Sequence, residues 1–281
     1  MEQWIIDSEA AIRLGFFIGI FVIISIWELI APRRPLHFSK PIRWYSNIGL
    51  VILNSLVMRW LFPVLATGLA LIAQERGWGL FNNVNMTYEL RIVLSVIAMD
   101  FIIYLQHAMF HALPLLWRLH RMHHTDLDYD VTTGARFHPL EIIISMFIKL
   151  AIIALIGPPV LSVIIFEVVL NFTAMFNHGN IRIPVKIDRV LRLVVVTPDM
   201  HRVHHSVIPK ETNTNFGFNL PWWDHLFGTY CHQPEKGHEG MTIGLNQFRN
   251  PKNLHLHMLF IQPFLDSTDD YAINKRKQNM V

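Results

Sequence analysis

Five long apolar stretches, nearly free of charged residues, constrain the fold of this chain more than any other feature. A helix needs about 20 apolar residues to cross a hydrocarbon core of roughly 30 Å. Arg59 and Pro63 interrupt the second stretch, which predicts either one kinked helix or two shorter segments packed against other parts of the protein. The stretches cover residues 14–31, 48–73, 90–106, 142–156 and 160–176. The sequence therefore predicts an all-α, multi-pass integral membrane protein.

Composition agrees with a membrane protein and excludes several other classes. Hydrophobic residues make up 52% of the 281 residues and charged residues only 16%. The net charge of +3 comes from scattered Lys and Arg, which form no stripe that would bind nucleic acid. Cys231 is the single cysteine, so the chain forms no internal disulfide and no cysteine-based zinc site. Any metal must therefore be held by histidine or carboxylate.

The loop charges predict how the chain is oriented in its membrane. Arg33 and Arg34 follow the first apolar stretch, and Lys40 and Arg43 come next, so this loop is expected on the cytoplasmic side. Counting crossings from there puts residues 107–138 and everything after His178 on the same side. Residues 182–281 are more polar and predict a cytosolic part packed on the helices. The short chain favours a bacterial inner membrane.

Histidines are concentrated in short clusters at the ends of apolar stretches. Residues 107–124 hold five of the 16 histidines, where chance would place about one. His107 and His111 are four residues apart, which puts both imidazoles on one face of a helix. The segment from His120 to His124 returns as a near copy, and Thr197 and Pro198 predict a helix start just before that copy. The two copies contribute His120, His123 and His124, and His201, His204 and His205.

These eight histidines exceed the needs of one ion, so we expect a site for two metals. Neutral imidazole suits iron, zinc, copper or nickel and does not suit magnesium or calcium. Two other readings stay open, a zinc-dependent hydrolase and a membrane protein that binds metal without oxygen chemistry. The absence of a His-Glu-x-x-His motif disfavours the hydrolase. The position of the clusters at span ends disfavours transport, which places its sites near the bilayer midplane.

The pattern resembles the histidine boxes of the fatty acid hydroxylase and sterol desaturase superfamily. Further stretches at Arg136–Pro139, Asn177–Asn180 and Trp223–Thr229 resemble signatures of that family, in the same order. The resemblance implies a cytosol-facing, non-haem di-iron centre that uses O2 to hydroxylate or desaturate a sterol, fatty acyl or sphingoid lipid. His178 is a further candidate ligand, while His138 and Asp224 are candidates to support the ligands from outside, with no catalytic residue separable from these.

Electrons are expected from a separate reductase or carrier protein, because the chain has no dinucleotide fingerprint, haem attachment motif or cysteine cluster. The expected organisation is transmembrane helices over 1–90, a catalytic core over 91–232 and a cytosolic C-terminal tail over 233–281. The histidines at 225, 232, 238, 255 and 257 show no cluster spacing and are left outside the predicted site. The specific lipid and the oligomeric state have no signal in the sequence.

Overall fold

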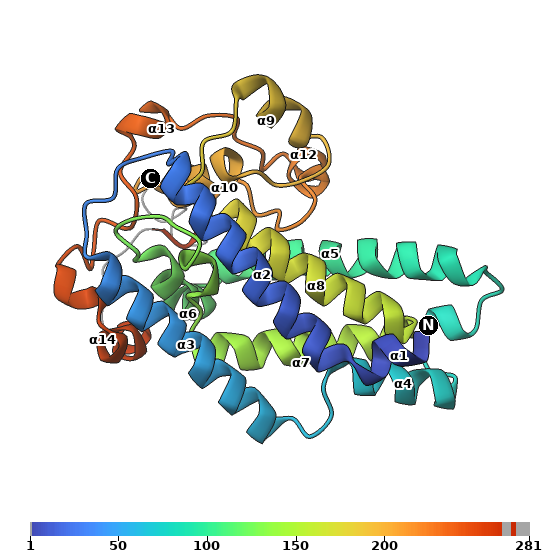
Figure 1. Cartoon of the computed structure of the whole chain (residues 1–281). Helices are drawn as coiled ribbons and strands as arrows, with labels where there is room; N and C mark the ends of the chain where they lie inside the picture. Colours follow the sequence, from blue (N-terminus) through green and yellow to red (C-terminus); the bar gives the residue numbers. More distant parts are fainter. Residues whose placement is uncertain (1, 266–270, 274–281) are drawn as a thin grey trace, which may run out of the picture.

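A computed structural model describes residues 2–265 and 271–273, and all regular elements within them are helices (Figure 1). The longer elements are α2 (Glu9–Ile30), α3 (Lys40–Leu61), α4 (Ala66–Arg76), α5 (Tyr88–Ala112), α6 (Pro114–His124), α7 (Pro139–Ile156) and α8 (Val160–Asn177). The short elements are α1 (Glu2–Asp7), η1 (Leu80–Asn82), η2 (Thr133–Ala135), α9 (Val185–Leu191), α10 (Pro198–His204), α11 (Pro209–Thr212), α12 (Trp222–Phe227), α13 (Gly237–Gly240), η3 (Pro251–Leu254), α14 (Leu256–Ile261) and η4 (Gln262–Phe264).

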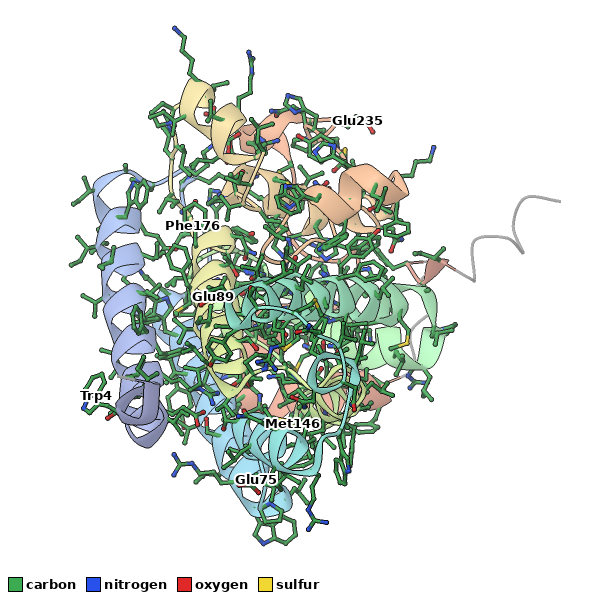
Figure 2. The ribbon with its side chains drawn as sticks, turned by 90° about the vertical axis from the view of Figure 1, so that its right-hand side faces the viewer. Trp4, Glu75, Glu89, Met146, Phe176 and Glu235 are labelled. Atoms are coloured by element: carbon green, nitrogen blue, oxygen red, sulfur yellow. The ribbon has the colours of Figure 1, made fainter. Side chains whose placement is uncertain are left out.

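Five segments are long and apolar enough to cross a membrane, which agrees with the predicted multi-pass helical fold. They are α2, the stretch formed by α3 and α4, α5, α7 and α8. Their outer faces carry apolar side chains that suit lipid rather than water. Leu29 and Ile30 of α2 are 72% and 77% exposed, and Trp4 of α1 projects away from the helices (Figure 2).

The second predicted span is two helices rather than one. α3 ends at Leu61, Pro63 lies in the break, and α4 begins at Ala66, because Pro cannot continue the hydrogen-bonded ladder of α3. α3 packs against α7, whereas α4 packs against both α7 and α8. The expected start at residue 48 was too late, since α3 begins at Lys40 and includes Arg43. Buried Asp126 and Asp130 pair with the Arg43 guanidinium at 2.6 Å each, so this charge is accommodated inside the helical structure.

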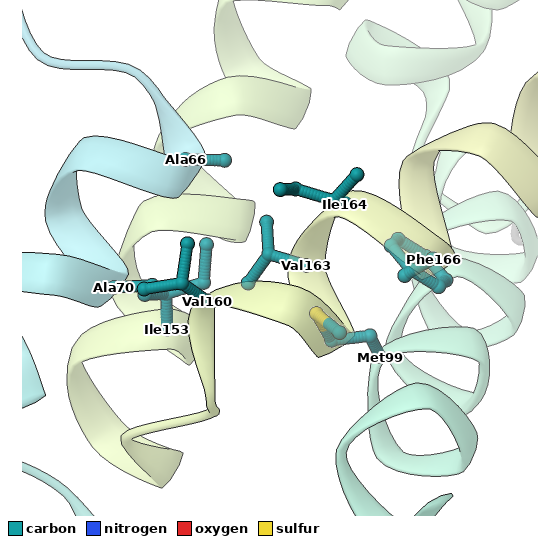
Figure 3. Packing of buried hydrophobic residues seen from close by; sticks show 8 residues of the cluster. All are labelled: Ala66, Ala70, Met99, Ile153, Val160, Val163, Ile164 and Phe166. Atoms are coloured by element: carbon teal, nitrogen blue, oxygen red, sulfur yellow. The ribbon is translucent and has the colours of Figure 1, made fainter. Parts of the chain in front are cut away.

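α7 and α8 form the predicted helical hairpin, and glycine is required at its turn. Gly157 has a φ of +59°, and a Cβ there would lie 2.2 Å from the carbonyl oxygen of Trp78. The turn thus packs directly on the loop before α5, at the end of the bundle away from the histidines. Apolar residues of α4, α5, α7 and α8 form the core beside it, including Met99, Val163 and Phe166 (Figure 3).

The other end of the bundle gathers the loops that carry the predicted site. The backbone nitrogen of Arg33 donates to the carbonyl of Asn180, and that of Arg182 donates to the carbonyl of Ala31, so the ends of α2 and α8 lie together. The Arg43 pairs bring α3 to the loop after α6. All three histidine clusters therefore share one end, as expected, and the side of the membrane that this end faces stays a prediction.

The polar part of the chain folds over this histidine end as short helices, as expected for residues after 182. The described part of the predicted tail, 233–265 and 271–273, also packs on the helices. Leu259 of α14 packs with Leu50 and Met122, and Tyr271 stacks on Trp117 with ring centroids 5.9 Å apart. The other residues of that tail lie outside the described part of the chain, and the division into three segments remains a prediction.

Candidate metal centre

All nine predicted ligands come together in two buried groups. Within each group one nitrogen from every histidine lies within 4.8 Å of the others. The five-histidine group consists of His107, His111, His120, His124 and His204, and the four-histidine group consists of His123, His178, His201 and His205. The two groups are neighbours, since the ring centroids of His124 and His205 are 4.6 Å apart. The arrangement places two sets of ligand-type nitrogens side by side.

Helical spacing explains how α6 and α10 each serve both groups. His120 and His124 are four residues apart on one face of α6 and enter the five-histidine group, while His123 faces the other group. α10 reverses the assignment. His201 and His205 enter the four-histidine group and His204 enters the five-histidine group. Thr197 caps this helix, because its side chain accepts from the backbone nitrogen of Met200, and Pro198 is its first residue.

Backbone carbonyls fix the orientation of three rings. The Nδ1 of His107 donates to the carbonyl of Phe216 at 2.8 Å, and the Nδ1 of His204 donates to that of Thr214 at 2.7 Å. His178 makes the same contact with the carbonyl of its own helix at Ala174. Because a carbonyl only accepts, each Nδ1 carries the proton, and the Nε2 of the neutral ring has a free lone pair.

Two further rings are held by side chains that the sequence did not indicate. Glu141 of α7, which is 4% exposed, accepts from His120 Nδ1 at 2.6 Å. Asn213 accepts from His111 Nδ1 at 3.0 Å. Ligand imidazoles usually give their other proton to such an acceptor, which orients the ring and raises its basicity. Glu141 had a weak signal as an acid at the start of an apolar helix, whereas Asn213 had none.

The inward nitrogens approach one another without a proton to share. The Nε2 atoms of His107 and His120 are 3.2 Å apart, and in both rings Nδ1 holds the proton. Buried nitrogens without any hydrogen-bond partner include both ring nitrogens of His201 and of His205, and Nε2 of His204. A buried polar atom without a partner is costly. These rings fit a role as metal ligands.

The electrostatic environment keeps the rings in the form that binds metal. Burial, and then the neighbouring histidines, lower the pKa of His123, His124, His204 and His205 well below the usual value. Burial also lowers the pKa of His178 to about 3. Neutral imidazoles without thiolate form a donor set for iron, zinc, copper or nickel.

Neither His138 nor Asp224, the two residues predicted to support the ligands from outside, forms a hydrogen bond with a ring of the two groups. His138 caps α7, because its Nδ1 accepts from the backbone nitrogen of Leu140, and its ring lies beside Phe260. Asp224 acts one step away from a ligand. Its carboxylate accepts from the backbone nitrogens of Phe216 and Gly217 at 2.8 Å each, and the Phe216 carbonyl is the group that orients His107.

Comparison with known proteins places this centre in a family. Residues 92–229 match the family described as Fatty acid hydroxylase. The ornithine lipid hydroxylase OlsE of Rhizobium tropici is 31% identical over 51% of this chain and 43% of its own length. An alkylglycerol monooxygenase of Xenopus tropicalis is 28% identical over 75% of this chain and 46% of its own. A very-long-chain aldehyde decarbonylase, GL1-6, of Oryza sativa is 24% identical over 58% of this chain and 27% of its own length.

This chain thus spans less than half the length of each of these relatives. No solved structure matches it significantly. The matched residues contain every histidine of both groups and the carboxylate of Glu141. Over residues 92–229, this chain belongs to the fatty acid hydroxylase superfamily.

Proposed function

We propose that this protein is a membrane lipid oxygenase in which the two histidine groups hold two iron ions and O2 is used to hydroxylate a lipid. The observation that supports the proposal is the pair of adjacent buried groups whose unprotonated nitrogens face inward. Iron held there would supply the redox chemistry that activates O2 toward an unactivated C–H bond. The five-histidine group would hold one ion and the four-histidine group the other.

The chain itself would hold the ions, orient the ligand rings and exclude bulk water from the centre. Glu141, Asn213 and the carbonyls of Ala174, Thr214 and Phe216 fix the outward proton of five rings, so that the inward lone pairs are ready to bind. Every ligand is at most 6% exposed, so bulk water is excluded from the centre. Exclusion of water protects a reactive oxidant from side reactions.

The substrate would be a lipid with a saturated alkyl chain that arrives from the bilayer. The centre lies at the end of apolar helices, and two of the relatives are named for the hydroxylation or monooxygenation of lipids. Hydroxylation consumes one C–H bond, O2, two electrons and two protons, and yields the alcohol and water. The electrons would come from a separate reductase or carrier protein. The histidine end would face the cytoplasm, and the membrane would be a bacterial inner membrane.

Metal content tests the proposal first. Protein purified in detergent is expected to hold about two irons per chain, and the double variant His123→Ala, His204→Ala, which removes a ligand from each group, is expected to lose them. His255→Ala with His257→Ala is the matched control, because both rings are exposed and outside the groups. Zinc alone, with no turnover after iron replacement, would favour the hydrolase or metal-binding reading. A protein without metal would refute the central claim.

Lipid profiling identifies the reaction. Cells that express the chain are grown under ¹⁸O2, and their lipids are compared with those of cells that express the double variant. A lipid that gains one ¹⁸O atom indicates hydroxylation. A lipid that loses two hydrogens and gains no label would indicate desaturation instead. A shortened hydrocarbon would point to the chemistry for which the Oryza relative is named.

A further inference from the structure

An exposed apolar surface lies on α9, the loop after it and α12, outside the five spans. Seven side chains on it are each more than half exposed: Val185, Ile187, Val190, Leu193, Val194, Leu226 and Phe227. These residues form the α9–α12 surface. The indole nitrogen of Trp222 donates to the carbonyl of Leu193, and the backbone nitrogen of Val196 donates to the carbonyl of Asn219, so the two segments are held together. Water-facing surfaces rarely carry apolar patches of this kind.

We propose that the α9–α12 surface is immersed in the bilayer, in the leaflet at the histidine end, although no part of it crosses the membrane. The proposal goes beyond the oxygenase function and does not depend on it. The occupant of the surface is therefore lipid, at the boundary between acyl chains and headgroups. A protein partner and a second copy of this chain are the rival occupants.

The α12 part of the surface packs directly on α5, which is one of the five spans. The rings of Trp223 and Phe227 lie 4.7 Å and 5.8 Å from that of Phe101, and Phe227 also stacks on Tyr104 at 5.5 Å. The indole nitrogen of Trp223 donates to Asp100 at 2.7 Å. This bond gives the buried acid inside the span a hydrogen-bond partner. The α12 segment is thus fastened to the middle of a membrane helix.

Helix length then sets the depth of that attachment. α5 has 25 residues, which corresponds to about 37 Å at 1.5 Å per residue. Phe101 lies about 20 Å along the axis from Tyr88, the end away from the histidines. A hydrocarbon core is roughly 30 Å thick, and any tilt of α5 brings Phe101 closer still to the opposite surface. The rings that pack on Phe101 therefore lie within the thickness of the acyl chains.

The charges on α9 agree with a position at headgroup level. Lys186 and Arg189 are exposed between the apolar residues, while Asp188 forms a salt bridge with Arg192 at 2.6 Å. Long basic side chains bury their stems in an apolar layer and reach out to the anionic headgroups. Apolar residues with exposed lysine and arginine fit a lipid interface better than the mixed surface of a soluble carrier protein.

Site-directed spin labelling tests the proposal in the full chain, reconstituted in lipid nanodiscs. The background is Cys231→Ser, which removes the single cysteine. Labels are placed at Val190→Cys, Leu193→Cys and Leu226→Cys. Ile23→Cys on α2, where the native residue is 62% exposed on a spanning helix, is the lipid reference, and Lys236→Cys is the aqueous reference. Power saturation compares collisions with O2, which enters lipid, and with a water-soluble nickel complex.

Immersion predicts that the three labels lose nickel collisions to the level of the Ile23 label while O2 collisions stay high. Nickel collisions equal to those at Lys236 would place the surface in water and overturn the proposal. Low collisions with both reagents would show that protein covers the surface and would overturn it as well. A lipid-borne diazirine on the unsubstituted chain checks the result without mutation, because the acyl chain should crosslink to peptides from 185–194 and 222–227.

Discussion

Replacing Glu141 should weaken one of the two proposed metal sites and spare the other. In Glu141→Gln the amide oxygen can still accept from His120 Nδ1, but the bond loses its charge. Hydrogen bonds to charged groups contribute about 1.5–3 kcal/mol and neutral ones about 0.5–1.5 kcal/mol. The difference of about 1–1.5 kcal/mol corresponds to about a five- to twelvefold loss of metal affinity. Glu141→Leu removes the acceptor and should cost about 10- to 100-fold.

Chelator competition measures this effect. Iron-loaded protein under argon is titrated with a chelator, and the iron that remains bound is counted per chain. Because His120 belongs to the five-histidine group, one iron equivalent should leave at a lower chelator concentration in the variants, and the other should leave as in the parent. Glu239→Gln is the control, since that carboxylate is 74% exposed and pairs with Arg33, not with a ligand ring. Equal release from parent and both variants, or an equal shift of both equivalents, would refute the reasoning.

Three further predictions concern the centre and the structure that holds it. His204 and His205 are neighbours that serve different groups, so His204→Ala and His205→Ala should each keep one iron per chain by elemental analysis, and the double variant should keep none. A double variant that still keeps one iron would contradict the assignment. Burial lowers the pKa of His238 to about 3, so the unfolded chain binds more protons at this residue than the folded protein between pH 3 and 6.5. The free energy of unfolding should therefore fall by about 2 kcal/mol more in the parent than in His238→Gln as pH drops from 6.5 to 5. Melting curves check this, and an equal pH dependence of parent and variant would contradict it. Arg43→Met removes the guanidinium that pairs most closely with the buried carboxylates of Asp126 and Asp130, and leaves Asp126 only the more distant Arg136 at 4.0 Å. The fold should lose about 3–5 kcal/mol, which thermal melting in detergent checks. A melting temperature unchanged from the parent would show that the pair is dispensable.

The fold was largely predictable from the sequence because an apolar run as long as the hydrocarbon core is thick predicts a membrane-spanning helix. The ends of the spans were less predictable. The apolar run of α5 ends near residue 106, but the helix continues to Ala112 and carries His107 and His111 into the centre, as their spacing predicted. α3 begins at Lys40 because Arg43 is neutralised by acids more than 80 residues away, and nothing near Arg43 in the sequence announces such a partner.

The candidate site, too, was predictable from the sequence only in part. Spacing along a helix predicted eight of the clustered histidines, His178 was added from its place after an apolar span, and the structure brings all nine together. The division into two groups depends on how α6 and α10 face each other, which local spacing does not encode. The groups that orient the rings were missed because most are backbone carbonyls, such as those of Thr214 and Phe216, and every residue has one. A carboxylate such as Glu141 carries a signal only once its helix is known to end at the centre.

The assignment of ligands to groups also sets an order for biogenesis. Four members of the five-histidine group are encoded before residue 125, so most of that group exists as soon as α5 and α6 have been made. The four-histidine group has only His123 at that stage and must wait for α8 and α10. Both groups are closed by the same late segment, His201–His205. A nascent chain stalled after α6 could therefore capture one ion loosely, whereas the pair forms only after the last membrane helix is in place.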